Sequence, residues 1–277
     1  MHTTTSNDTS VSANTRSIKD RSQLMSTLHG HDRSTTIATY HAAIEKHIGT
    51  RTSRLTRAGT TVHPIAQRDE SGVSSAYRIG PSTTIWCAPR HADPLAELVA
   101  DDTLGLDAYD SWCADRGGEL VGGGMSLLLD DVRPRPAPIP AGGRSMLIDR
   151  EVADQVAAVR AFVAELDPDD VDAAEVDPDD IDPAAVLLRD RRGSSVAFAS
   201  WLPWDIDSRF GDVGVLTSGA HRGEGWGRAA VALAIGIAFE RGIIPLYRCN
   251  DDNEPSWRLA ESLGFRQISR LRAWRLP

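Results

Sequence analysis

Apolar residues recur at helical spacing in three parts of the chain. Between Thr35 and Ile48 they lie along one side of a helix, and Gly49 follows as a stop signal. Glu151–Leu166 also carries its apolar residues on one face, which predicts an amphipathic helix. Val231–Phe239 is apolar nearly all round, so we expect a helix buried between a sheet and a neighbouring domain.

Short runs rich in β-branched residues predict strands. Thr60–Ile65, Val73–Ile79 and Thr83–Cys87 are separated by turn residues, which indicates an antiparallel meander. Further strands are expected within Glu119–Leu129 and at Val186–Arg189, Val196–Leu202, Asp212–Thr217 and Ile243–Cys249, and short helices at Leu95–Val99 and Leu106–Cys113. The pattern indicates an α/β (α+β) protein whose C-terminal strands build a sheet.

Composition divides the chain into three regions. Residues 1–33 are rich in Ser, Thr, Asn and Asp and lack apolar periodicity, so we expect a disordered tail. The Pro/Gly-rich loop Arg133–Gly143 then separates an N-terminal α+β unit, 34–143, from a second domain, 144–277. The N-terminal unit carries no motif that can be tied to chemistry, and we expect its Trp86 and Trp112 in the core.

An acidic repeat lies near the start of the second domain. Leu166–Glu175 is echoed by Val176–Ala185, and each copy offers an Asp cap followed by Pro at the first helical position. Two interpretations remain open. The repeat forms an acidic lip that attracts a cationic amine, or it is a solvated loop whose charges mostly repel one another.

Charge and cysteine content exclude several classes of partner. A net charge of −9 over 277 residues argues against a nucleic-acid partner, which favours a basic face. The three cysteines lack the spacing of a zinc site, so we expect no metal and reduced thiols in a cytoplasm. No stretch approaches the ~20 uninterrupted apolar residues of a membrane-spanning helix, and we expect neither an anchor nor a signal peptide.

A glycine-rich loop follows one of the expected strands. After Val213–Thr217, glycines stand at alternate positions, Gly223, Gly225 and Gly227, at the start of a helix. The missing Cβ atoms allow a close approach, and the first helical amides are donors, as is typical of a phosphate-binding loop. A Walker loop is excluded because no Lys-Ser/Thr follows Gly227, and a Rossmann fingerprint because Arg228 occupies the place of its third glycine.

Two motifs in order resemble those of the GNAT acyltransferase family. Arg222-x-x-Gly225-x-Gly227 is similar to the family's pyrophosphate loop, and the run from Asn253 to Phe265 reproduces its Asn, Ser, Leu and Gly-Phe at matching spacing. The resemblance covers about residues 184–277. Residues around Pro245 look most like a subgroup that includes proteins conferring resistance to self-made amino antibiotics.

The resemblance implies a C-terminal mixed sheet flanked by helices, preceded by the N-terminal α+β unit, and a site for acetyl-CoA. In the family, the strands equivalent to Asp212–Thr217 and Ile243–Cys249 splay apart, and the pantetheine arm lies in the gap. Pro245 has no N–H and fits a strand whose neighbour has diverged. The implied cofactor-binding residues are Val215, Leu216 and Thr217 for the pantetheine, Arg222, Gly223, Glu224, Gly225, Trp226, Gly227 and Arg228 for the pyrophosphate, and Asn253 for the arm or as a helix cap.

The catalytic groups depart from the family's common pattern. Many relatives carry a Tyr as general acid seven residues after the Asn, where this chain has Ala260. Ser256 and Tyr247 are the nearest plausible proton donors, although Ser256 also suits a helix cap. Candidate bases are carboxylates near the expected acceptor mouth, chiefly Asp212, with Asp205 and Asp207 as alternatives.

The sequence therefore predicts an acetyl-CoA-dependent N-acetyltransferase that acts on a small amine. A protein N-terminal or lysine acetyltransferase is the alternative within the class, and it requires an open groove. A non-catalytic acyl-CoA-sensing module is the alternative outside the class, since the usual Tyr is missing. We expect a monomer or homodimer without nucleic-acid or membrane partners.

Overall fold

The computed structural model describes residues 33–48, 58–99, 105–129, 134–174, 176, 178 and 185–277. The expected disordered tail lies outside these residues except for Arg33, as does most of the second copy of the acidic repeat. The helices are α2 (Arg33–Ile48), α3 (Arg68–Ser71), α4 (Pro89–Leu98), α5 (Leu106–Ala114), α6 (Ala153–Ala164), α7 (Pro168–Ala174), α8 (Trp226–Glu240) and α9 (Glu254–Leu263), with a 3₁₀ turn at Gly219–His221. The strands are β1 (Gly59–Pro64), β2 (Val73–Ile79), β3 (Ser82–Cys87), β4 (Glu119–Leu129), β5 (Arg144–Ile148), β6 (Ala185–Arg189), β7 (Ser195–Pro203), β8 (Phe210–Thr217), β9 (Ile244–Asn250) and β10 (Phe265–Arg275).

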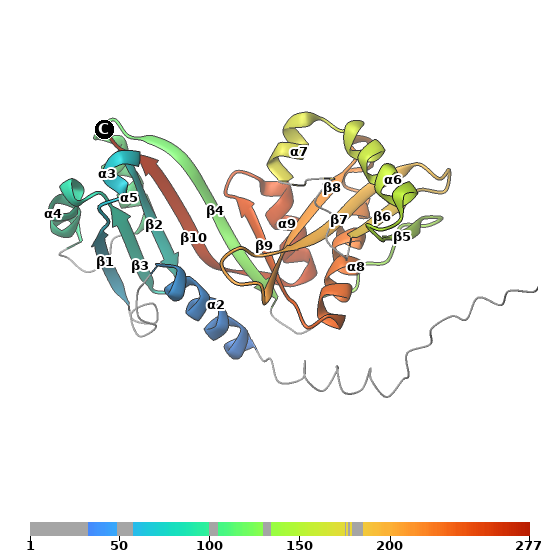
Figure 1. Ribbon diagram of the computed structural model, residues 1–277, viewed down its shortest axis with the longest axis horizontal. Coiled ribbons are helices and arrows are strands. Elements are labelled where there is room, and N and C mark those ends of the chain that lie inside the picture. The colour runs from blue at the N-terminus through green and yellow to red at the C-terminus, as the bar shows by residue number, and fades with distance from the viewer. Residues whose placement is uncertain are drawn as a thin grey trace, which may run out of the picture.

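The described strands form one mixed sheet flanked by helices, which confirms the expected α/β class. Their order is β1-β3-β2-β10-β4-β9-β8-β7-β6-β5. Two neighbouring pairs are parallel, β1 with β3 and β8 with β9, and the others are antiparallel. The long strands β4 and β10 run diagonally through the middle of the sheet and join its two halves (Figure 1).

Strands from both sides of the loop 134–143 alternate at the centre of this sheet. β10 pairs with β2 on one side and with β4 on the other, and β4 pairs in turn with β9. The loop itself contains neither helix nor strand. The division at residue 143 stays a prediction, but the two expected units share backbone hydrogen bonds.

Helices cover both faces of the C-terminal half of the sheet. On β6, Val186 and Leu188 face the apolar α8, whereas Ala185 and Leu187 belong to the cluster that contains α6 on the opposite face. The alternation follows from the period of two along a strand. Because both faces are buried, these strands read as continuous apolar runs.

The N-terminal half has its own cover. α4 packs on β1, α5 packs on β2 and β10, and Trp86 and Trp112 are buried as predicted. The helix α2 lies over the junction, where its Tyr40 packs near β2, β4, β8 and β9. The Tyr40 hydroxyl also forms a hydrogen bond of 2.8 Å with Ser269 on β10. α2 therefore ties both halves of the sheet together.

The predicted meander was wrong, and two strands were missed. β1 is parallel to β3 and does not form a meander, because the one-turn helix α3 replaces the tight turn that a meander requires. β5 and β10 were not expected from the sequence. No helix among the described residues is long and apolar enough to span a membrane.

Gly143, at the end of the loop 134–143, tests how tightly the loop packs against the start of α8. A Cβ atom there would lie 2.6 Å from the Trp226 ring. Gly143→Ala is expected to lower the free energy of unfolding by about 1–3 kcal/mol through overpacking, measured by chemical denaturation. Gly236→Ala, inside α8 with open space around its Cβ, is the matched control and is expected to stabilise by about 0.5–1 kcal/mol. Equal losses in both variants would contradict the packing argument.

Candidate active site

Strands β8 and β9 run together for only three residue pairs. The register ends at Asp212 opposite Leu246, although β8 continues to Thr217 and β9 to Asn250. Each strand keeps its outer neighbour, since Thr217 still pairs with Ala197 and Asn250 with Gly124. The expected splay is therefore confirmed, and one backbone edge of each strand is left without a strand partner beyond this point.

Pro245 lies elsewhere than its missing N–H suggested. It stands opposite Gly211 inside the paired stretch, and not in the diverged part. The Ile244 N–H donates to Arg209 on the β8 side, so the nitrogen of the next residue faces β4. The β4 ladder ends at Leu128 opposite Leu246, and the proline therefore interrupts no hydrogen bond.

The glycine loop connects β8 to α8. Gly223 and Gly225 have φ values of +78° and +90°, a left-handed conformation that favours glycine. Gly227 has a different reason, because a Cβ atom there would lie 2.6 Å from the Thr217 hydroxyl oxygen. The glycines thus shape the turn and its packing, and their role in clearing the approach for a ligand stays a prediction.

The amides of this loop are available as donors. The first hydrogen bond of α8 runs from the Ala229 N–H to the Gly225 carbonyl, 3.0 Å. Within the described part of the chain, no acceptor is found for the amides of Gly223 to Arg228. Unpaired amides at the positive end of a helix dipole fit a pyrophosphate.

A cavity of about 560 Å³ lies between this loop, the open part of β8 and α9. All the predicted cofactor-binding residues line it except Glu224, whose carboxylate instead accepts a hydrogen bond from the Trp226 indole, 3.0 Å. Four arginines also line it, Arg222, Arg228, Arg248 and Arg258. This charge is complementary to the phosphates of a CoA ester.

The first copy of the acidic repeat forms a wall of the cavity. Asp170 on α7 forms an ion pair of 2.5 Å with Arg222 of the glycine loop, and this hydrogen bond raises the pKa of the Arg222 guanidinium. α7 packs directly over β8, since a Cβ atom on Gly214 would lie 3.6 Å from the carbonyl oxygen of Ala174, the last residue of the helix. Neither interpretation of the repeat foresaw this contact, because spacing along the chain cannot show which loop an acidic helix will meet.

Ser256, Tyr247 and Cys249 meet beside the gap. The Tyr247 hydroxyl is buried and lies 3.0 Å from the Ser256 hydroxyl. Burial raises the pKa of the Tyr247 hydroxyl, and it raises the pKa of the Cys249 thiol to about 11. The hydrogen bond with Ser256 lowers both pKa values, but by less than burial raises them. Both groups therefore stay protonated near neutral pH, and Tyr247 can donate to Ser256 Oγ.

Asn253 is the N-cap of α9, with its side-chain oxygen 3.2 Å from the Ser256 amide. The predicted cap role of Asn253 is confirmed, and the capping alternative for Ser256 is wrong. The side chain of Ser256 is consequently left for Tyr247, Cys249 and the cavity. Ala260, in the place of the family's Tyr, is fully buried in the core and contributes no polar group.

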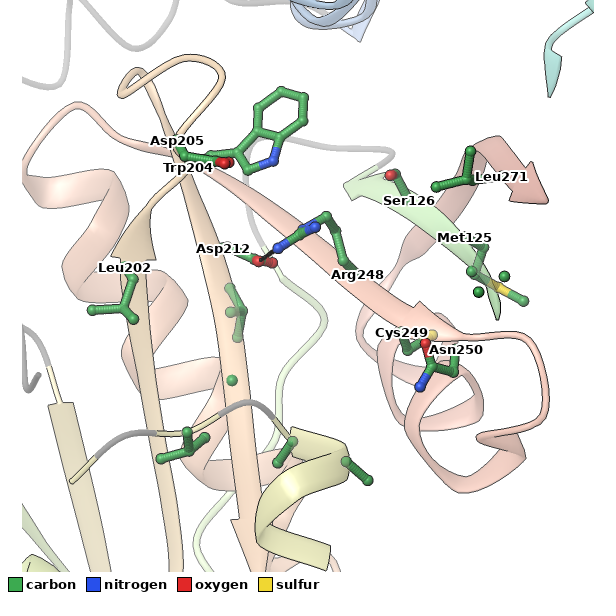
Figure 2. A pocket seen from close by; sticks show the side chains of 18 of the residues that line it. Met125, Ser126, Leu202, Trp204, Asp205, Asp212, Arg248, Cys249, Asn250 and Leu271 are labelled. Atoms are coloured by element: carbon green, nitrogen blue, oxygen red, sulfur yellow. Dashed lines mark hydrogen bonds and ion pairs between the residues drawn. The ribbon is translucent and has the colours of Figure 1, made fainter. Parts of the chain in front are cut away.

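A second cavity, of about 510 Å³, opens on the other side of the gap. It meets the first cavity beside α7 and between β8 and β9, because both are lined by Ala173, Ala174, Val213, Gly214, Arg248 and Cys249. Figure 2 shows its other wall, where Met125 and Ser126 on β4 lie beside Leu271 on β10. Gly122, Gly123 and Gly124 on β4 contribute backbone without side chains and widen the space.

The carboxylates expected as bases differ in their surroundings. Asp212 lies in the second cavity and binds Arg248 through the guanidinium Nε at 2.8 Å and Nη2 at 2.5 Å (Figure 2). Asp205 also lines this cavity, whereas Asp207 is outside its lining and is held by Arg209 at 2.6 Å. The base assignment to Asp212 stays a prediction, and its ion pair with Arg248 could not be expected from the sequence.

Comparison with known proteins finds a family model that matches part of the chain. Residues 156–265, less than half of the chain, match the family model described as the acetyltransferase (GNAT) family. No curated protein matches the sequence.

Several solved structures of acetyltransferases are similar over much of their length. A GCN5-related N-acetyltransferase from Kribbella flavida is 23% identical, with 73% of this chain and 68% of that chain covered and a TM-score of 0.47. One from Sphaerobacter thermophilus is 12% identical, with coverage of 73% and 77% and a TM-score of 0.47. A GNAT-family acetyltransferase from Colwellia psychrerythraea is 12% identical, with coverage of 61% of both chains and a TM-score of 0.45.

The ion pair between Asp170 and Arg222 generates a prediction about CoA binding. Asp170→Asn removes a negative charge from the wall of the cavity and frees Arg222 for the pyrophosphate. We expect CoA to bind about two- to fivefold more tightly in calorimetry at low salt, with the difference shrinking as salt rises. Asp169→Asn, one residue away on the same helix and exposed, is the matched control and should leave the affinity unchanged. Weaker binding by Asp170→Asn would mean that Asp170 positions Arg222 for the ligand.

Proposed function

We propose that this protein transfers the acetyl group of acetyl-CoA to the amine of a small molecule, because residues 156–265 match the model of the acetyltransferase (GNAT) family. The narrower resemblance to antibiotic self-resistance enzymes extends the proposal to an amine-bearing antibiotic or related metabolite. A monomer or homodimer acting in the cytoplasm fits this role. The transfer needs no metal, and the described residues contain no group of three or more His, Cys, Asp or Glu side chains suited to hold one.

The meeting of two cavities between β8 and β9 carries the proposal. One cavity is lined by unpaired amides and arginines, which suit a pyrophosphate, and the other lies across the gap. A pantetheine arm entering between the strands would bring its thioester to the shared residues Val213, Gly214 and Cys249. An acceptor in the second cavity would then face the reacting carbon.

Acetyl transfer to an amine proceeds in three steps. The neutral amine attacks the thioester carbon, the carbon–sulfur bond of the tetrahedral intermediate breaks, and the sulfur leaves as a thiolate that takes up a proton. We assign Ser256 as the proton donor. The Tyr247 hydroxyl can donate a hydrogen bond to Ser256 Oγ, which directs the Ser256 proton toward the cavity. We assign Asp212 as the general base that takes up the proton lost by the amine.

The size of the acceptor cavity favours a small molecule. A volume of about 510 Å³ holds a metabolite, whereas a protein N-terminus or lysine would need a groove along which a peptide can lie. The lining residues come from both halves of the chain, including Tyr77, Met125, Leu202 and Leu271. The N-terminal half thus supplies one wall of the acceptor site.

One experiment tests both the proposed activity and its proton donor. CoA release from acetyl-CoA is followed with and without a panel of small amines, for the wild type and for Ser256→Ala. We expect release that depends on an amine, and a fall of at least about tenfold in kcat for Ser256→Ala, since a general acid contributes about 10²–10⁴-fold. CoA affinity and melting temperature should stay near those of the wild type.

Tyr247→Phe provides the comparison. This variant loses the Tyr247 hydroxyl that bonds Ser256, but it keeps the Ser256 hydroxyl. Its kcat should therefore fall less than that of Ser256→Ala. CoA binding without release for any amine in the panel would favour the sensing module. Unchanged turnover in Ser256→Ala would leave water or Tyr247 as the proton source.

A further inference from the structure

The acceptor cavity presents two opposite charges side by side. Of the described residues that line it, three are charged, namely Asp205, Asp212 and Arg248. Asp212 lies at the last paired position of β8, and Arg248 lies on β9 just beyond the point where the strands part. Figure 2 shows the two side chains reaching toward each other across the opening gap.

This ion pair is accessible from the cavity. The side chains of Asp212 and Arg248 are 23% and 43% exposed, and both Nε and Nη2 of Arg248 contact one carboxylate oxygen, Oδ2, of Asp212. An exposed ion pair contributes little to stability, so a ligand can exchange its partners at a small cost. The guanidinium has the planar fork that recognises carboxylates.

A ligand with an ammonium group alone matches only half of this pair. It would compete with Arg248 for Asp212 and would leave the guanidinium without the carboxylate it holds now. A ligand that carries an ammonium and a carboxylate matches both partners, because its carboxylate takes Arg248 and its ammonium takes Asp212. The exchange also turns Asp212 toward the nitrogen whose proton must be removed.

The rest of the cavity suits the remainder of such a molecule. Its apolar lining includes Met125, Val176, Leu202 and Leu271, and Ser126 offers a hydroxyl on the same wall as Met125. The cavity lies directly beside the space expected for the thioester, since Arg248 and Cys249 line both.

We propose that the acceptor is an amino acid or a similar zwitterion, whose carboxylate is bound by Arg248 while Asp212 faces its amine. The proposal rests on the acetyltransferase function above and narrows its substrate class. Arg248 is then a specificity-determining residue, and its effect depends on whether the acceptor carries a carboxylate.

The test compares matched acceptors. A panel of L-amino acids is assayed beside the corresponding carboxamides and decarboxylated amines, by CoA release and by calorimetric titration into the CoA-loaded protein. We expect kcat/KM and affinity to be at least about tenfold higher for the free carboxylates, as for other hydrogen bonds between charged groups. Arg248→Gln should abolish this preference, and Arg248→Lys should restore part of it.

Arg209→Gln is the matched control, because Arg209 forms a similar exposed ion pair with Asp207 away from the cavity. It should keep the wild-type preference, and every variant is compared at saturating CoA because Arg248 also lines the first cavity. Carboxamides or simple amines that bind and react as well as amino acids would overturn the zwitterion proposal while leaving the acetyltransferase function intact. Weakened CoA binding in Arg248→Gln, with the carboxylate preference retained, would instead assign Arg248 to the cofactor. If no amine in the panel binds or reacts although CoA binds, both the zwitterion proposal and the proposed function fail.

Discussion

The separation of β8 from β9 after three residue pairs is the constraint on which the site depends. Two parallel strands that stayed paired to their ends would fill the space between the two cavities with backbone hydrogen bonds. Both strands remain anchored by their outer neighbours, β7 and β4, so the gap opens inside a sheet that is otherwise continuous. The glycine loop and α8 begin at the end of one strand, and the N-cap Asn253 follows the end of the other. The divergence therefore brings the amide donors and the hydroxyl of Ser256 to opposite sides of one opening.

The same sheet explains why the N-terminal half belongs to the site. β10 is the last strand in sequence, yet it lies between β2 and β4 and carries Leu271 into the acceptor cavity. Beneath this wall, Arg272 bonds Asp110 on α5 at 2.8 Å and also contacts Asp251, which follows β9. Gly123 leaves room for this side chain, since a Cβ atom there would lie 2.6 Å from Nη1 of Arg272 and the guanidinium would have to shift. The contacts that hold the N-terminal half together therefore also shape the wall of the acceptor cavity.

Elements whose signals lie close together in the sequence could be predicted from it. The apolar run of α8, the Asn253 cap and the glycine loop follow from residues close in sequence, and the motifs they form indicated where the strands part. Contacts between distant segments could not be read in this way. The Arg248 to Asp212 ion pair joins two strands separated by a helix, and Asp170 meets Arg222 only because α7 packs on β8. β5 and β10 were missed because their status as strands depends on neighbours elsewhere in the chain. Pro245 was placed in the wrong part of β9 because a sequence does not show which strand a missing N–H faces.

A crystal structure of the protein with acetyl-CoA tests the central claim most directly. The account predicts that the pantetheine arm lies between Val215 on β8 and Cys249 on β9, with the pyrophosphate on the amides of Gly223 to Arg228. It also predicts that the thioester sulfur lies within about 3–4 Å of the Ser256 hydroxyl, or one water away. A pantetheine arm outside the gap between β8 and β9, or a sulfur remote from Ser256 and from the acceptor cavity, would contradict it.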